Sequence, residues 1–498
     1  MMYCQVVNGM NYILLTFNLI LLIYLFVFIN YILMEVNMML VKLPKGMKDF
    51  LILWSGQLFS LLGTSMTAFA LTLWAWQITG KATSLALVGF FHFLPTLIFS
   101  PLAGALVDRW NRKTVMILSD VCSGLATFVI FLLLLSGKLQ IWHLYIAASW
   151  SGIFQSLQFP AYSAAIGIMV PKEQFARTTG LTSMTEAGVY ILSPVLSGAC
   201  VGFIGVKGVL IIDLITLMLA VSTIALVKIP HPKTSATVKN SLWKDSLFGF
   251  RYIWDRKPLL GLLGVFFLSN LFGTLGQMVY APMILSRTGN NQMILGAAQS
   301  FFGIGGVVGG LLVGIWGGPK RKGLGVILGV SGSSLLGAVF FGIGDTLFWW
   351  SIGGLLVSIF GSISHASSQA IWMSKVPPEF QGRVFSSRRF IAQCISPIAM
   401  LVSGPLADKF FEPMMLNPSG IFSLFTRLVG SSKGSGMALM MFIFGILGVL
   451  AGLWGYMNPM IRDVDRVVPD HDDSLEEAEE EDPVSSTDFI NFPVPSPA

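Results

Sequence analysis

The chain has 498 residues, of which 54% are hydrophobic and only 11% are charged. Its mean hydropathy is +0.74, whereas a soluble domain usually has about 25% charged residues. These few charged residues cannot supply a polar coat for a protein of this length. The composition therefore excludes a soluble globular protein and predicts an all-α membrane protein.

Apolar stretches of 18 or more residues recur along the chain, separated by short polar segments. A transmembrane helix needs about 20 such residues, so each stretch is a candidate span, and the longest should tilt or kink. We predict twelve helices, at 50–79, 84–107, 114–136, 139–170, 181–206, 208–228, 258–286, 292–318, 323–344, 346–374, 390–407 and 436–461.

One further apolar run, residues 13–34, precedes the twelve predicted helices. Three interpretations stay open: a thirteenth helix, a signal sequence, or the translation of an upstream reading frame. The run lacks the basic segment and the cleavage site of a signal sequence. Met38, Met39 and Met47 are alternative starts before the first core helix.

Basic residues are divided unequally between the two sides that alternating helices define. One side receives 24 of the 31 lysines and arginines, and the other side receives 7. The positive-inside rule predicts that the richer side is cytoplasmic, together with the C-terminus. We therefore expect a multi-pass protein of the cell membrane with a cytoplasmic C-terminus.

The net charge of +6 hides two opposite regions, because ten of the 25 acids lie between Asp470 and Asp488. The basic remainder is typical of contact with anionic membrane lipid. No nucleic-acid-binding motif is present, so no nucleic-acid partner is expected. The acidic segment 462–498 is predicted to be a disordered cytoplasmic tail.

An internal repeat divides the chain into two halves. Residues 170–173 (VPKE) and 376–379 (VPPE) match at an offset of 206 residues, and a Ser-Pro pair follows each of them. Duplicated six-helix halves are typical of transporters, with the substrate cavity between them. The predicted organisation is an extension at 1–46, bundles at 47–230 and 258–461, a cytoplasmic linker at 231–257, and the tail.

Residues 104–113, GALVDRWNRK, form the end of the second predicted helix and the short turn after it. They resemble the signature G-x-L-x-D-R-x-G-R-K of the major facilitator superfamily. Asn111 replaces a glycine of the signature, and we expect it to keep the turn because Asn tolerates a left-handed backbone. The resemblance implies twelve helices in two pseudo-symmetric bundles, the major facilitator fold.

The same resemblance implies a conformational gate at the cytoplasmic side. In the family, the signature aspartate pairs with the start of helix 11 when the transporter opens outward. The gating residues implied here are Gly104, Asp108, Arg109, Arg112, Lys113, Arg388 and Arg389.

Within the superfamily the chain is similar to bacterial macrolide-efflux and enterobactin-exporter proteins, on segments such as WSGQLFSLLGTSMTAFALTLW and SGPLADKFFEP. Gly188, Pro194 and Gly198 also resemble the antiporter signature of helix 5, with serines at two glycine positions and one extra residue of spacing. The resemblance implies export of amphipathic drugs or metabolites across a bacterial inner membrane.

Acids inside apolar helices are costly and are therefore candidates for proton coupling. Glu186, early in helix 5, is the first candidate, with a structural ion pair as the alternative. Asp120 could instead belong to a cytoplasmic charge cluster with Lys113, two turns away. Asp213 could instead be water-exposed or cap a helix near the outer end of helix 6.

Amides and imidazoles inside the predicted helices are candidates for substrate contacts in an otherwise apolar cavity. The alternative is that they hold the helices together. The candidates are Gln57, His92, Gln155, Gln277, Gln299, His365 and Gln369.

No hydrolase or nucleotide-binding motif is present, and the histidines and cysteines lack metal-site spacing. We therefore expect no enzyme activity, cofactor or metal. The expected partners are an amphipathic substrate, protons and membrane lipid, and the expected state is a monomer. A proton-coupled drug exporter is the first hypothesis. A siderophore or lipid transporter of the same fold is the second, and a membrane enzyme is the third.

The topology is testable with single cysteines at Lys138 and Lys239 in a cysteine-free background. Because the two positions fall on opposite sides, an impermeant thiol reagent added to intact cells should label only the cysteine at Lys138. Labelling of both from outside would contradict the predicted orientation.

Overall fold

The structure, a computed structural model, describes residues 45–171, 174–229, 249–420 and 422–469. All regular elements of this described part are helices. The apolar run at 13–34, most of the predicted linker and the acidic tail lie outside the described residues.

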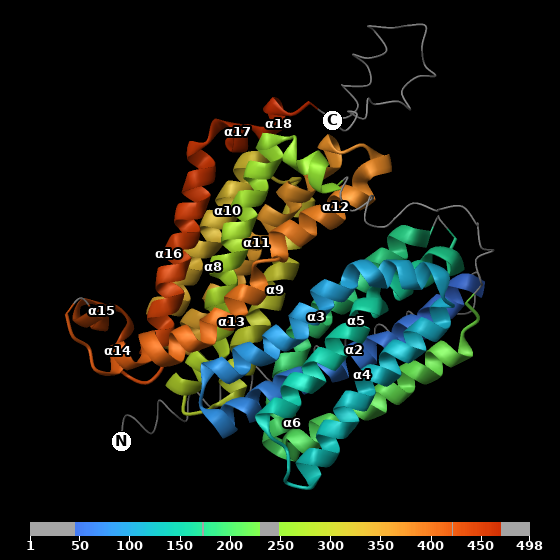
Figure 1. The fold of residues 1–498 in the computed structure, drawn as a ribbon, viewed down its shortest axis with the longest axis horizontal. Helices are drawn as coiled ribbons and strands as arrows, with labels where there is room; N and C mark the ends of the chain where they lie inside the picture. Colours follow the sequence, from blue (N-terminus) through green and yellow to red (C-terminus); the bar gives the residue numbers. More distant parts are fainter. Residues whose placement is uncertain (1–44, 172–173, 230–248, 421, 470–498) are drawn as a thin grey trace, which may run out of the picture.

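The first half of the described chain forms one bundle of long helices (Figure 1). Left-handed glycines at Gly80 (φ 58°) and Gly137 (φ 68°) end two of these helices and let the chain reverse. The helices are α2 (Lys45–Thr79), α3 (Ala82–Arg109), α4 (Arg112–Leu135), α5 (Ile141–Met169) and α6 (Phe175–Leu226).

Helix α6 runs for 52 residues and contains two membrane crossings. Gly205 interrupts it with φ 68° and ψ 177°, a conformation that residues with a side chain rarely adopt. The break confirms the two helices that were predicted at 181–206 and 208–228.

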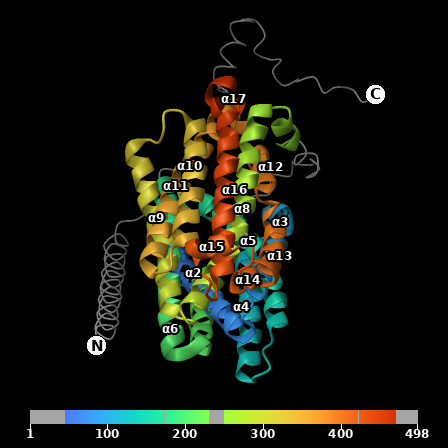
Figure 2. The ribbon, with the colours of Figure 1, turned by 90° about the vertical axis from the view of Figure 1, so that its left-hand side faces the viewer.

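The second half forms a second bundle, in which α8 and α16 run side by side (Figure 2). Its long helices are α8 (Lys257–Arg287), α9 (Gln292–Trp316), α10 (Lys322–Gly337), α11 (Leu347–Lys375), α12 (Pro378–Gln393), α13 (Ser396–Leu406) and α16 (Ser435–Met457). Its shorter elements are η2 (Ala338–Ile343), η3 (Ala407–Phe411), α14 (Glu412–Leu416), α15 (Phe422–Val429), α17 (Pro459–Arg462) and α18 (Val464–Val467).

Helix 11 differs from its predicted span of 390–407. It begins at Pro378, breaks after Gln393 and continues as α13, η3 and α14 to Leu416. Arg388 and Arg389 made its first turns too polar to be recognised by hydropathy. Pro397 lacks a backbone N–H, which explains a break at this point in the helix.

Ten helices of the described chain are long and apolar enough to cross a membrane. This number counts α6 once and leaves out α5, which is more polar. Helix α5 has 29 residues and packs against α3 and α4, and at 1.5 Å per residue it is long enough to cross. With α5 and the division of α6, the described chain has the twelve predicted crossings.

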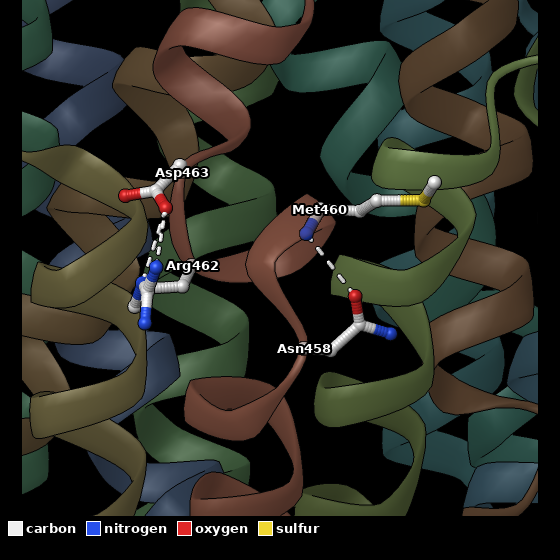
Figure 3. A network of polar contacts seen from close by, with 4 residues as sticks. All are labelled: Asn458, Met460, Arg462 and Asp463. Atoms are coloured by element: carbon white, nitrogen blue, oxygen red, sulfur yellow. Dashed lines mark hydrogen bonds and ion pairs between the residues drawn. The ribbon is translucent and has the colours of Figure 1, made fainter.

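The last crossing ends at Met457, four residues before the predicted end, because Asn458 turns the chain. Its side-chain oxygen accepts a hydrogen bond from the Met460 N–H at 3.1 Å and so caps α17 (Figure 3). Arg462 donates to Asp463 Oδ2 from Nε (3.1 Å) and Nη2 (2.9 Å). These bonds hold the pKa of the Asp463 carboxyl below its usual value.

The two ends of the molecule differ in how the bundles are held together. We call the end with the turns after α3, α5, α9 and α11 the basic end, and the end with the turns after α2, α4 and α8 the sealed end. At the sealed end one continuous cluster of buried apolar residues contains members of both bundles, such as Leu73, Tyr280 and Met440.

At the basic end the apolar core is divided. One cluster, which includes Phe50 and Met116, belongs to the first bundle. The other, which includes Leu262 and Trp372, belongs to the second bundle. The bundles therefore share a core at the sealed end and have separate cores at the basic end.

Close backbone contacts join α6 to α9 toward the sealed end. A methyl group at Gly296 would lie 2.5 Å from the Pro194 carbonyl oxygen. Ser300 Oγ donates a hydrogen bond of 2.6 Å to the Ile191 carbonyl. Small residues allow this approach, as is common between membrane helices.

Gly296→Ala is expected to weaken this junction, because the new methyl group would require the backbone of α6 to move. Overpacking of this kind costs about 1–3 kcal/mol. We expect a lower melting temperature in detergent, measured by intrinsic tryptophan fluorescence.

Gly314→Ala is the matched control, since no atom lies within 4 Å of the methyl group it would add on the same helix. It should melt like the unaltered protein. Equal melting temperatures for the two variants would show that closure does not depend on the close approach at Gly296.

Candidate functional site

A cavity of about 670 Å³ lies between the bundles, on the basic side of the α6–α9 junction. Helix α6 contributes Glu186 and Tyr190, and α11 contributes His365. Glu186 and His365 are both exposed. The other lining residues are apolar or small, including two serines. They are Ala187, Phe302, Gly303, Gly306, Val307, Gly310, Val313, Ser358, Gly361, Ser362 and Ala366.

The cavity therefore contains one carboxylate and one imidazole in otherwise uncharged walls. Glu186 was predicted as a coupling acid and His365 as a substrate contact, and the structure brings them to the same cavity. Most of the small and aromatic lining was not predicted. Its sequence signal is the recurrence of Gly303, Gly306 and Gly310 on one face of α9.

The remaining amide and imidazole candidates do not line this cavity. Gln155 and Gln277 are exposed elsewhere on α5 and α8, and Gln299 is half-buried on α9. The carbonyl of His92 lies against α5 at Gly152, where an added methyl group would be 2.3 Å away. The two helices therefore pack closely at this position, away from the cavity.

Asp120 forms a buried polar cluster with two glutamines. Its Oδ2 accepts from Gln57 Nε2 at 3.0 Å, and its Oδ1 accepts from Gln158 Nε2 at 2.9 Å. Gln158 Nε2 also donates to Gln57 Oε1 at 2.9 Å. The cluster joins α2, α4 and α5 inside the first bundle, as the alternative interpretation of these amides predicted.

Lys113 does not pair with Asp120. Its Nζ donates to the carbonyls of Ala225 (2.6 Å) and Val227 (2.9 Å), at the end of α6. The structure thus corrects the interpretation of Asp120 as part of a charge cluster. Its hydrogen-bond partners in the described chain are neutral amides.

Asp213 is 4% exposed, which corrects the expectation of a water-exposed or capping residue. Its Oδ1 accepts from Thr64 at 3.1 Å, and its Oδ2 accepts from Thr127 at 3.2 Å. Three helices of the first bundle meet at this carboxyl group. Hydroxyl donors from α2 and α4 satisfy it, where its place near the outer end of helix 6 had suggested water.

The turn between α3 and α4 carries the signature, and it differs from expectation at Asn111. The residue has φ −62°, so the turn needs no left-handed backbone there. Its side chain instead accepts the Lys113 N–H at 3.0 Å and caps α4. Arg112 Nη1 donates to the Ala164 carbonyl at 3.0 Å.

Part of the predicted gate lies outside the described side chains, namely Gly104, Asp108 and Arg109. Arg388 donates to Gln369 Oε1 at 3.1 Å and to Ser368 Oγ at 2.9 Å, and its guanidinium lies 5.2 Å from the Trp372 ring centroid. It therefore joins α12 to α11 within one bundle. Arg389 is exposed.

The antiporter-like motif lies at the α6–α9 junction. Pro194 is the residue that Gly296 approaches, and a methyl group at Gly198 would lie 3.0 Å from the Gln292 carbonyl oxygen. Gly188 has no atom within 4 Å of an added methyl group. Two of the three motif residues thus lie where the bundles meet.

The sequence profile of the Major Facilitator Superfamily matches residues 53–400. The chain belongs to this superfamily. It is a membrane transporter with twelve crossings in two bundles, and not an enzyme.

Two curated relatives carry the names of exporters. Macrolide efflux protein A of Streptococcus pyogenes is 26% identical over 378 residues, which are 72% of this chain and 89% of the relative. Enterobactin exporter EntS of Escherichia coli O81 (strain ED1a) is 26% identical over 321 residues, which are 62% of this chain and 71% of the relative.

Solved structures share the fold at low sequence identity. The crystal structure of the nucleoside transporter NupG has a TM-score of 0.59 at 13% identity, covering 82% of this chain and 98% of NupG. A bacterial homolog of the human lysosomal transporter Spinster, in an inward-facing and unoccupied conformation, has a TM-score of 0.60 at 14% identity. It covers 85% of this chain and 99% of its own.

Proposed function

We propose that the protein exports small amphipathic molecules from the cytoplasm by proton-coupled alternating access. The observation that carries this proposal is the cavity between the bundles, with Glu186 as its one carboxylate. The protein would act as a monomer in the cell membrane. Its partners would be the substrate, protons and lipid.

The orientation follows from the distribution of lysine and arginine. If the basic end faces the cytoplasm, as the positive-inside rule predicts, the C-terminus is cytoplasmic too. Among the described residues, the bundles share a core only at the other end. This arrangement corresponds to an inward-facing state, in which the cavity would receive substrate from the cytoplasm.

The substrate class follows from the cavity walls and the relatives. A volume of about 670 Å³ lies within the range of sites for drug-sized ligands. Phe302, Val307 and the glycines of α9 offer apolar contact, while Glu186 and His365 offer two polar ones. The names of the relatives, a macrolide efflux protein and an enterobactin exporter, support export over import.

Coupling is assigned to Glu186 because it lies in the cavity where substrate would bind. Such a carboxylate can bind either a proton or the polar group of the substrate, but not both at once. Exchange of one for the other across the membrane is antiport. Asp120 and Asp213 are the next candidates. They are buried within the first bundle and hydrogen-bonded to neutral groups, so they are further from the substrate.

Glu186→Gln separates coupling from binding. The variant keeps the size and hydrogen-bonding capacity of the side chain but cannot carry an exchangeable proton. In inverted membrane vesicles with an acidic interior, we expect accumulation of a radiolabelled macrolide to fall at least tenfold. Exchange of preloaded for external macrolide, without a gradient, should change less than twofold.

Asp120→Asn is the matched control, and it should keep gradient-driven accumulation. If Glu186→Gln accumulates macrolide and Asp120→Asn does not, coupling belongs to the Asp120 cluster. If neither protein variant nor the unaltered protein moves a macrolide, the substrate class is wrong. A catecholate siderophore is then the next probe, because of the similarity to the enterobactin exporter.

A further inference from the structure

The start of α3, in the first bundle, is capped by a carboxylate of the second bundle. Asp408 Oδ1 accepts the backbone N–H of Ala82 at 3.0 Å, and Oδ2 accepts the N–H of Thr83 at 2.8 Å. The Thr83 hydroxyl also donates to Oδ2, at 2.5 Å. The N-cap residue of α3 itself, Lys81, makes no side-chain capping bond.

This contact has the chemistry of a helix cap but crosses the boundary between the bundles. The first N–H groups of a helix have no partner within the helix, and the positive end of the helix dipole favours an anion there. Hydrogen bonds to an ionised acceptor are stronger than those between neutral groups. A single side chain thus satisfies two backbone donors of the opposite bundle.

The packing around Asp408 holds the carboxylate in place. One turn earlier, Gly404 lies against the same helix start, because an added methyl group there would be 2.3 Å from Thr83 Cα. Ser403 Oγ donates to the Leu275 carbonyl at 2.8 Å and fixes α13 to α8. Asp408 therefore follows a segment of the second bundle that is packed against α3 and hydrogen-bonded to α8.

A second polar contact crosses the boundary at the same end. Trp76 Nε1, on α2, donates to Asn290 Oδ1 at 2.8 Å. Asn290 has φ 66°, in the left-handed region. The indole and amide are neutral, whereas Asp408 supplies an anion to three donors. The carboxylate thus makes stronger contacts than this neutral pair and than the neutral Ser300–Ile191 hydrogen bond at the α6–α9 junction.

We infer that Asp408 is the gating residue of the sealed end, which holds the bundles together there and must release the start of α3 before that end opens. The inference rests on alternating access by a transporter of this superfamily. It does not rest on the substrate or the coupling proton. Its experiment therefore reads the two conformations directly, without a transported molecule.

The test measures distances between spin labels at Lys138 and Lys433, in the full chain reconstituted in lipid nanodiscs. Both positions are exposed at the sealed end, one in each bundle. Asp408→Asn keeps the shape of the side chain but has only one oxygen to accept hydrogen bonds. We expect the ratio of long to short distances to rise roughly tenfold, the scale of one lost charge-assisted bond.

Asp345→Asn is the matched control. The substitution removes the same charge at the same end of the second bundle. Asp345 lies in the turn between η2 and α11. Among the described residues, its side chain caps no helix of the first bundle. It should leave the distances unchanged. An equal effect of Asp408→Asn and Asp345→Asn would overturn the inference.

Thr83→Val provides an independent second variant. It removes one of the three donors while the backbone N–H groups stay, so its shift should have the same direction and be smaller. If Asp408→Asn fails to fold, this variant decides alone. An unchanged distance distribution for Thr83→Val would then refute the role.

Discussion

Among the described residues, the two bundles of this transporter bury their facing apolar surfaces in one shared cluster at one end only. At the sealed end, residues such as Leu73 and Tyr280 belong to one cluster that spans both bundles. At the basic end, Phe50 and Trp372 belong to separate clusters. In the bilayer, lipid can cover apolar side chains as well as another helix does. Close packing and polar contacts must therefore decide where the bundles meet.

Polar contacts join the helices within each bundle. Lys113 holds the end of α6, and Arg388 holds α12 against α11. Asp120 and Asp213 tie three helices each, through amides and hydroxyls. A buried carboxyl group is costly in a membrane unless it is satisfied. These four residues therefore stabilise the bundles, whereas Glu186 remains exposed in the cavity between them.

The contacts between the bundles are of a different kind. Small residues bring α6 and α9 together at Gly296, and Gly404 brings α13 to the start of α3. Few polar bonds need to break for these surfaces to separate, and those of Asp408 are the strongest of them. At the basic end the resemblance to the superfamily implies a similar role for Asp108, at the other end of α3.

The sequence by itself determined the membrane class, the twelve crossings and most helix ends. Hydropathy and basic loops are local signals, and the break that the structure shows at Gly205 agrees with the two helices predicted there. The hydropathy pattern missed the start of helix 11, because Arg388 and Arg389 lower the hydropathy of that part of the transmembrane segment. Of the site, the sequence predicted Glu186 and His365 as separate candidates.

Only the tertiary structure decided what each polar side chain contacts. Asp120 meets Gln57 across 63 positions of the sequence, and Asp408 meets Thr83 across 325. Nothing in the local pattern relates such residues. In a soluble protein, the apolar face of a helix would indicate its buried side. In a membrane helix both faces are apolar, because lipid replaces water, so the sequence shows that a helix crosses but not which side meets its neighbours.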